Sequence, residues 1–474
     1  MLLSRTPVLA AAALCASLVA APCFAADGVP DPDFGVGGAA FITPDDVEAR
    51  ELQPSAAIVL PDGKLLFGGQ RSKYNPAVPF EPEFRAMLAQ MNPDGSVDTD
   101  FGNTSIPGVV VLPALVPGAR MEGIESMQRL DDGSIIAVGV SQVNTPLRGF
   151  VVKLDATGAM DTSFGGGTGF VLVDSTYLHA VAIDSQGRIV ASGEHIENPV
   201  YTSTVIRLTA DGTFDDTFGT GGTATIEWDG AGESGYLTSM TLLADDRIVV
   251  GGFYEVYGSG LGSDFALARL ATDGTPDTEF AGTGWRVFHD PSENSWINGI
   301  NRLALTPDGG VAFAGYHMSG ENITGLVVGH VGADGNTDEA FGDAASPGFF
   351  KPAILPTAQS AYASSLLVQG DGKLVVAVTY YALFPDKQDF FALRATATGQ
   401  LDTSFADSGI FDFDLAPAGV YSDLSTMTFQ PDGNLILAGR SMQSTEESIV
   451  DLGVMRLLNG GEPNDRIFAS GFDP

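Results

Sequence analysis

The 474-residue sequence has few of the residues that staple small exported domains or carry common nucleophilic catalysis. Its two cysteines, Cys15 and Cys23, both lie in an N-terminal segment that we expect to be removed. A mature chain without thiols has no disulfide and no cysteine nucleophile, so packing must stabilise it. The sequence also lacks a G-x-S-x-G motif, and its five histidines are scattered with no H-E-x-x-H pair. These absences favour a protein without enzymatic activity.

Positive charge is also scarce. The chain has 23 Lys and Arg against 59 Asp and Glu, a net charge of −36, and loss of the N-terminal segment with Arg5 would make it −37. Nucleic acid and anionic lipid surfaces repel such a chain, so we expect neither as a partner. The acids occur singly along the sequence, which favours a solvated acidic surface over one loaded with Ca²⁺.

Residues 1–25 resemble a secretory signal peptide. Arg5 precedes the apolar run VLAAAALCASLVA, and the small residues Cys23 and Ala25 suit cleavage after Ala25. The run is too short to span a membrane. We therefore expect a protein that is secreted, periplasmic or associated with the cell surface, has no inserted segment and acts as a monomer.

One unit recurs from residue 26 to residue 458 without a linker, and residues 459–474 form a C-terminal tail. A signature such as PDGKLLFGG places a turn residue before an apolar run at Gly63, Gly133, Gly187, Asp246, Gly309, Gly372 and Gly433. A second element, Asp-x-x-Phe, keeps step with it and ends at Phe34, Phe101, Phe164, Phe218, Phe280, Phe341 and Phe405. The repeat indicates one large domain.

Each unit is expected to form four short strands. Runs of about six residues alternate Val, Ile, Leu and Phe with Ala, Thr and Ser, a pattern typical of strands buried on both faces. Asp-Gly between the second and third runs predicts a tight hairpin, because glycine accepts the positive φ that the turn needs. Seven such sheets can bury their faces only by packing radially, so we predict an all-β, seven-bladed β-propeller rather than an open solenoid.

Several motifs carry a resemblance to a known family. PDGK followed by an apolar strand, FALARL at 265–270 and MDTSFG at 160–165 resemble the delta-60 repeat proteins, a bacterial family of predicted β-propellers. The resemblance covers all seven units and implies a propeller that is commonly exported. It implies no reaction and no catalytic residues.

The ring could close in two ways. Either each repeat is one blade, or the strand at 37–41 completes the last blade beside 453–458. We favour the second arrangement because it ties the two ends of the array together.

The DG-x-x-D element resembles half of a calcium loop. The position upstream of it varies among Asn92, Asp155, Thr209, Ala271, Gly332 and Thr396, so no consistent carboxylate completes a cage. Turn caps are favoured over Ca²⁺ ligands, and we expect no cofactor.

Strand parity separates a constant face from a variable one. The Asp-Gly turns and the Asp-x-x-Phe connections fall on one face, and all the irregular loops fall on the other. Tyr and Trp in or beside these loops combine flat apolar area with a polar tip, which suits binding. The predicted ligand-binding residues are Trp228, Tyr254, Tyr257, Trp296, Tyr316, His317, Tyr380 and Tyr381. Filling of space between blades is the competing explanation for these aromatics.

We therefore predict an exported, non-catalytic propeller whose variable face binds an extracellular glycan, peptide or protein. A hydrolase or lyase with carboxylates in the central funnel is one alternative, since propellers host both kinds of function. A cell-surface structural repeat without a discrete pocket is the other.

Overall fold

The computed structural model describes most of the repeat array. Its described residues are 27–44, 49–73, 82–102, 106–142, 147–197, 200–228, 234–255, 262–290, 297–319, 323–353, 358–382, 389–416, 422–442 and 449–460. The expected signal peptide lies outside these residues, as does the tail beyond Gly460, so both remain predictions. No helix in the described part of the chain could span a membrane.

The strands fall into antiparallel groups that we number as units 1 to 7. Unit 1 contains β3 (Ala49–Val59), β4 (Leu65–Lys73), β5 (Glu83–Met91) and β6 (Val109–Val111). Unit 2 contains β7 (Met121–Arg129), β8 (Ile135–Gln142), β9 (Leu147–Leu154) and β10 (Phe170–Asp174). Unit 3 contains β11 (Thr176–Ile183), β12 (Ile189–Glu197), β13 (Val200–Leu208) and β14 (Thr223–Thr225). A 3-10 turn, Gly165–Gly167, precedes β10.

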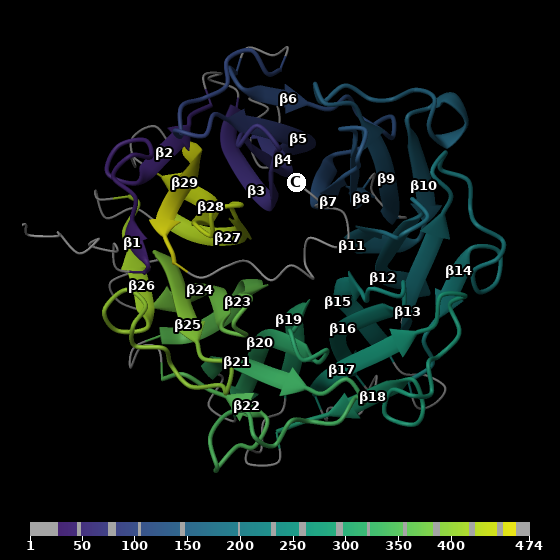
Figure 1. The fold of residues 1–474 in the computed structure, drawn as a ribbon. Coiled ribbons are helices and arrows are strands. Elements are labelled where there is room, and N and C mark those ends of the chain that lie inside the picture. Colours follow the sequence, from purple (N-terminus) through teal and green to yellow (C-terminus); the bar gives the residue numbers. More distant parts are fainter. Residues whose placement is uncertain are drawn as a thin grey trace, which may run out of the picture.

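Unit 4 contains β15 (Ser234–Leu242), β16 (Ile248–Glu255), β17 (Ser263–Leu270) and β18 (Trp285–Phe288). Unit 5 contains β19 (Ile297–Leu305), β20 (Val311–Ser319), β21 (Ile323–Val331) and β22 (Phe349–Phe350). Unit 6 contains β23 (Ala358–Val368), β24 (Leu374–Ala382), β25 (Phe390–Ala395) and β26 (Ile410–Phe413). Unit 7 contains β27 (Ser422–Phe429), β28 (Leu435–Met442) and β29 (Val450–Leu458). In Figure 1 the first strand of each unit lies nearest a common centre and the fourth lies at the periphery.

The pairing shows that a structural unit is offset from the sequence repeat by one strand. The strand that opens the fourth sequence repeat, β14, pairs with β13 of unit 3, with Ala224 opposite Val205. The same offset brings the start of the chain into unit 7. There β2 (Ala39–Ile42) pairs antiparallel with β29, with Ala39 opposite Met455, and β1 (Val29–Pro30) pairs with the end of β29. The predicted pairing of 37–41 with 453–458 is therefore confirmed.

The hairpin turns follow the chemistry expected of Asp-Gly. Gly63 has a φ of +82°, and Asp246, the exception in the repeat, also adopts a positive φ of +65°. The preceding Asp accepts a backbone N–H two residues on, as when Ser134 donates to Asp132 Oδ1 over 2.8 Å. After the turn the second strand enters the core, and residues 135–141 of β8 are all buried.

The Phe of Asp-x-x-Phe joins each unit to the next. Phe218 is fully buried, and a Cβ added to Gly274, in the Asp-Gly turn that follows β17 of unit 4, would lie 2.9 Å from its ring. The residue after this Phe, Gly219, donates its N–H to Asp273 O of that same turn. The turn needs glycine both for its positive φ and for this close approach. A Phe contacts such a turn at every junction between units. The contacts that join neighbouring units therefore lie on the constant face.

A cation on the third strand completes the same contact in most units. Arg269 of β17 donates from Nε to Asp277 Oδ2 over 2.6 Å and lies 5.1 Å above the Phe280 ring. Its Nη1 reaches the carbonyl oxygen of Ala333 in unit 5 over 2.5 Å. We call this contact of Arg, Asp, Phe and the next unit's turn the inter-unit clamp. Equivalent arginines are Arg207, Arg394 and Arg456.

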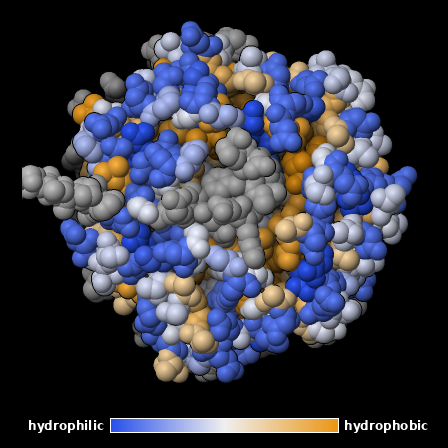
Figure 2. All heavy atoms as spheres, in the orientation of Figure 1, coloured by the Kyte–Doolittle hydropathy of each residue, from blue (hydrophilic) through white to orange (hydrophobic). Residues whose placement is uncertain are grey.

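The core lies between adjacent units. One cluster joins Val205 and Phe218 of unit 3 to Leu237 and Val250 of unit 4, and similar clusters follow around the chain. Around the centre of the face seen in Figure 2, hydrophobic residues are visible between hydrophilic residues that dominate the periphery. The fold is therefore all-β, built from four-stranded sheets packed face to face.

The pairing of β2 with β29 yields a stability prediction. Deletion of residues 27–42 should abolish the cooperative unfolding transition of the whole molecule, because it removes the fourth strand of unit 7 and the Asp31 and Phe34 of its clamp. Val36→Ser, at a side chain that is 89% exposed in the same segment, is the matched control. Thermal unfolding followed by circular dichroism measures both. Loss of only a small part of the transition would contradict the prediction.

Asp451 of β29 yields a pH prediction. Burial raises the pKa of this carboxyl group from 3.8 to about 6, although the Thr43 side chain opposes the shift. The folded state thus holds a proton that the unfolded state releases near 3.8, and stability falls as the pH rises from about 4 to 6. Asp451→Asn should raise the free energy of unfolding by about 1–3 kcal/mol at pH 8 and by little at pH 3. Urea titrations at both pH values test this, and an equal gain at both would contradict it.

Candidate functional site

The innermost strand of every unit contains an irregularity at the same place. The strand register shifts around Ser55, Glu125, His179, Thr238, Asn301, Ser364 and Ser425, each at the position eight residues before the turn residue. A β-bulge re-aims the side chain of its extra residue. The repeat therefore presents seven equivalent side chains near the central channel.

Short hydroxyl residues at this position tie neighbouring units together. Thr238 Oγ1 donates to the Ile300 carbonyl of unit 5 over 2.5 Å, and Ser364 Oγ donates to the Leu424 carbonyl of unit 7 over 2.6 Å. Ser55 Oγ bonds the Ile124 carbonyl of unit 2 in the same way. In units 2, 3 and 5 a larger polar group replaces the hydroxyl, so these positions carry more than a structural bond.

Units 2 and 3 place a histidine among carboxylates and a tyrosine. His179 Nε2 lies 3.1 Å from Glu194 Oε2 of β12 and 3.2 Å from Oε1. The Tyr177 ring stacks on the imidazole with 4.5 Å between centroids and 13° between planes. The carboxylate orients the imidazole, an arrangement suited to proton transfer or to binding hydroxyl groups.

Glu125 and Arg302 face this group from two further inner strands. Burial raises the pKa of Glu125, while the charges of His179 and Arg302 oppose the rise. Its side chain is half-buried on β7. In Figure 1, β11 and β15 lie between β7 and β19 among the inner strands, so the charge of Arg302 acts on Glu125 from a strand that is not its neighbour. We call Glu125, Tyr177, His179, Glu194 and Arg302 the channel cluster.

Burial also favours the neutral forms of Tyr177 and Arg302 in the channel cluster. Burial raises the pKa of the Tyr177 phenol, and the charges of Glu125 and Glu194 add to the effect. Burial lowers the pKa of Arg302, and Glu125 opposes this. Arg302 also donates from Nη1 to the Asn301 carbonyl over 2.9 Å. Perturbed groups of complementary kinds gathered in one cleft are a mark of functional sites.

Half-buried aromatic residues extend from the cluster along the variable face. Tyr236 lies 4.9 Å from Tyr201 and 4.4 Å from Phe253, and Tyr316 lies 5.6 Å from Tyr362, all between ring centroids. Burial, followed by the charge of Glu255, raises the pKa of Tyr236 to about 12. We call these five aromatic residues the aromatic rim. They lie near the starts of inner and third strands or the ends of second strands, at the end of the channel where the irregular loops are.

The structure divides the residues predicted for binding. Trp228, Tyr254 and Tyr380 are 5%, 8% and 4% exposed and belong to the core between units, so they are corrected from binding to packing residues. Trp228 Nε1 donates to Ser203 Oγ over 2.9 Å, and Tyr380 Oη donates to Asp389 Oδ2 over 3.2 Å. These bonds satisfy the polar tips that had suggested a ligand.

The other predicted residues remain candidates. Tyr316 and His317 are half-buried on β20 at the variable face. Tyr257 and Trp296 lie outside the described residues, as does the side chain of Tyr381. Their role in binding stays a prediction.

The channel cluster was missed because its signal lies in a comparison between repeats. Aligned on the turn residues, the bulge position reads Ser, Glu, His, Thr, Asn, Ser, Ser, so Glu125 and His179 depart from the small hydroxyl residues that recur elsewhere. The DG-x-x-D motif is also explained: Asp273 caps its turn through Thr275, and Asp277 pairs with arginines. Among the described residues there is no group of three or more His, Cys, Asp or Glu placed to hold a metal ion.

Comparison with family models identifies the repeat. The model described as "Domain of unknown function (DUF5122) beta-propeller" matches residues 60–101, 130–164, 185–218, 243–280 and 369–405. Each match ends at the Phe of Asp-x-x-Phe, so the model describes the same unit as the clamp. These five stretches, less than half of the chain in total, resemble the repeat of a β-propeller family. No curated protein matches the sequence.

Several solved structures resemble the chain at low sequence identity. The polysaccharide lyase Uly1 is 12% identical with a TM-score of 0.51, covering 92% of this chain and 96% of its own. A protein of unknown function from Dyadobacter fermentans DSM 18053 is 12% identical with a TM-score of 0.41, covering 74% and 96%. The NanB sialidase from Streptococcus pneumoniae is 10% identical with a TM-score of 0.37, covering 92% and 71%. These likenesses concern the fold alone.

The raised pKa of Glu125 predicts how its replacement changes stability with pH. The folded state retains the Glu125 proton above the ordinary pKa of 4.5. The free energy of unfolding of the wild type therefore falls as the pH rises from that value through the folded pKa. Glu125→Gln should therefore gain stability over the wild type progressively from pH 4 to pH 8. Urea unfolding across this range measures the gain, with Asp216→Asn at an exposed carboxylate as the control. A gain independent of pH would contradict the prediction.

Proposed function

We propose that this protein is an exported, monomeric, seven-bladed β-propeller that binds a neutral glycan at the variable end of its central channel. The seven strand groups, the seven sequence repeats and the pairing of β2 with β29 support a closed ring. The delta-60-like repeats and the signal-peptide pattern support export.

The aromatic rim beside the carboxylates of Glu194 and Glu255 is the observation that carries this proposal. Flat aromatic faces pack on the apolar faces of sugar rings, and carboxylates and tyrosine hydroxyls bond the sugar hydroxyls. A glycan is favoured over a peptide because the rim alternates rings with acceptors rather than forming an apolar groove. A purely structural repeat would require no perturbed ionisable groups in the channel.

Acid–base chemistry on the bound glycan is the second candidate function. The channel cluster favours it, since Glu125 is biased toward its protonated form while Glu194 is paired with His179. A proton donor and a proton acceptor in one site are the requirement for cleaving a glycosidic bond by hydrolysis or elimination. Binding would then be a step of catalysis.

The proposal predicts that removal of the rim weakens glycan capture. Tyr236→Ala with Tyr316→Ala should reduce retention on an immobilised neutral polysaccharide, such as xylan, β-glucan or galactan, by at least about tenfold, or roughly 1.4 kcal/mol. Pro307→Ala, on the constant face, is the control. Equal retention of both variants on every polysaccharide that retains the wild type would contradict the proposal.

The same polysaccharides distinguish binding from catalysis. Release of reducing ends, or of products that absorb at the wavelength of a new double bond, would establish the second function. Glu125→Gln and His179→Gln should then abolish product formation while retention persists. Retention without product supports the binding function alone.

A further inference from the structure

Unit 5 departs from the inter-unit clamp at two positions. His330 of β21 occupies the place of the arginine, and Gly310 occupies the place of the cation that follows the turn in units 1, 3, 4 and 6. In those four units the clamp Asp bonds that second cation, as Asp277 bonds Arg247 over 2.9 Å. Asp338, the clamp Asp of unit 5, therefore lacks both arginine and lysine partners.

His330 makes the contacts of the clamp within its own unit but not the contact with the next unit. Its Nδ1 lies 2.9 Å from Asp338 Oδ2, and its ring lies 5.7 Å from the Phe341 ring. Its Nε2 turns back to Thr306 Oγ1 at 3.1 Å and lies 3.7 Å from Asp308 Oδ1, both within unit 5. The imidazole is too short to extend to unit 6 as the other arginines extend to their neighbours.

Comparison with the other units identifies the atoms of units 5 and 6 that an arginine at position 330 would contact. Arg207, Arg269 and Arg456 reach the carbonyl of the residue before the next unit's turn Asp, namely Thr272, Ala333 and Pro93. The corresponding residue of unit 6 is Ala397, since Gly342 N donates to the next carbonyl, Thr398 O. Arg207 and Arg394 also donate to Thr217 and Ser404, where unit 5 has Ala340.

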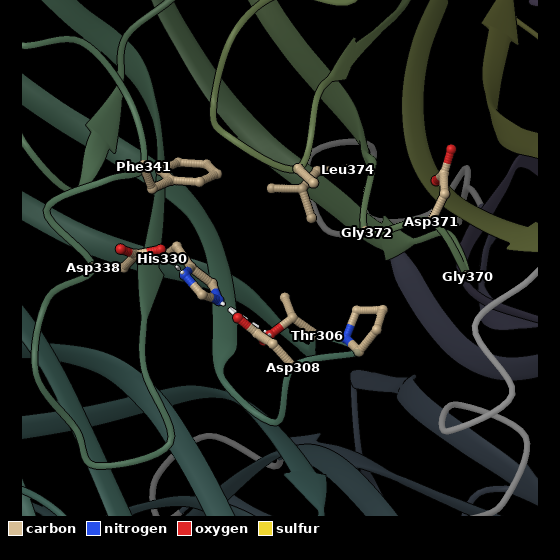
Figure 3. A pocket seen from close by; sticks show the side chains of 11 residues that line it. Thr306, Asp308, His330, Asp338, Phe341, Gly370, Asp371, Gly372 and Leu374 are labelled. Atoms are coloured by element: carbon tan, nitrogen blue, oxygen red, sulfur yellow. Dashed lines mark hydrogen bonds and ion pairs between the residues drawn. The ribbon is translucent and has the colours of Figure 1, made fainter.

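A cavity of about 240 Å³ lies at this place. Asp338, Phe341, His330 and Ala397 line it, together with the two exposed turns at 306–308 and 370–372. Figure 3 shows Phe341 and Leu374 on opposite sides, with His330 directed toward Thr306 and Asp308. The Asp338 side chain is 36% exposed, against 10% for Asp277 and Asp215 in filled clamps. The cavity therefore opens to solvent through the constant face.

We propose that this cavity binds a guanidinium group supplied by a ligand. A planar cation there would pair with Asp338, stack on Phe341 and donate to the Ala397 carbonyl, the three contacts that the arginines make in their own units. Asp308 adds a second carboxylate, and Asp371, which pairs with Lys373 over 3.3 Å, adds a third partly neutralised one. The charge of the lining favours a cation and rejects an anion.

The group can come from a small guanidino compound or from an arginine side chain of a polypeptide. A compact ammonium ion fits less well, because it cannot donate in one plane to both the carboxylate and the carbonyl while stacking on the ring. The proposed ligand is thus distinguished from a general cation by its planar shape. The site lies on the constant face and is independent of glycan binding at the opposite end of the channel.

Calorimetric titration with N-methylguanidinium chloride, at low millimolar concentrations far below those that denature proteins, tests the proposal. The wild type should bind one equivalent, and methylammonium should bind more than tenfold more weakly. His330→Arg should abolish binding by filling the cavity and raise the unfolding temperature by completing the clamp. Asp338→Asn should weaken binding more than tenfold. Failure of the wild type to bind, or unchanged binding by His330→Arg, would overturn the proposal.

A gain of binding provides the matched test, because Arg269→His with Arg247→Gly removes both cations of the unit 4 clamp and should open an equivalent cavity there. A stoichiometry of two for this variant supports the proposal, and a stoichiometry of one in a folded variant overturns the argument from equivalent units. If the variant does not fold, His330→Arg still decides the question. The peptide Gly-Arg-Gly distinguishes a polypeptide ligand from a small guanidino compound. Binding of the peptide at least as tight as that of N-methylguanidinium indicates a polypeptide ligand. Binding of N-methylguanidinium alone indicates a small molecule. Glycan retention by His330→Arg should equal that of the wild type.

Discussion

The stability of the array rests on a buried arginine that contacts its own unit and the next one at once. In Arg269 the guanidinium pairs with Asp277, lies over Phe280 and bonds a carbonyl of unit 5. A strand group of this size cannot bury both of its faces alone, so the junction between units is where the fold gains most of its stability. Removal of one partner from such a buried charged network costs about 3–5 kcal/mol, because the other charge stays desolvated.

The clamp also explains why an acidic chain keeps its few cations where it does. Burial alone would raise the pKa of Asp402, but bonds from Ser404 and the charges of Arg394 and Lys373 hold it at about 2. Asp402 is thus ionised at neutral pH. Its charge is neutralised locally, so the net charge of −36 is spread over solvated turns and not over the junctions.

Much of the fold was predictable because the structure of each repeat is determined by residues that are close in sequence. The Asp-Gly turns, the buried strands and the Phe between sheets each depend on residues close in sequence, and the pairing of β2 with β29 was predicted because it ties the two ends of the array together. The channel cluster was not predictable in the same way. The charge of Arg302 acts on Glu125 only because the fold brings β7 and β19 into the same part of the molecule, and nothing in either strand alone indicates the other.

The aromatic residues show where composition misleads. Trp228 and Tyr316 both lie beside irregular loops, yet Trp228 packs between units while Tyr316 stays half-buried beside Tyr362. The difference depends on whether the side chain points into a junction or along the variable face, and a shift of one residue in a strand reverses that direction. Aromatic content near loops is therefore weak evidence for a binding site.

Departures from the repeat are stronger evidence, because each unit serves as a control for the others. At the bulge position a serine or threonine hydroxyl is enough to join adjacent inner strands, as Thr238 and Ser364 show. Glu125 and His179 therefore add charge that the junction does not need, and a buried charge without a structural purpose costs stability. At the clamp the reverse holds: His330 replaces the guanidinium that units 3, 4, 6 and 7 use, and a cavity remains. Both exceptions weaken the fold locally, one on each face, and a cost of that kind is retained where the altered residues serve binding or chemistry.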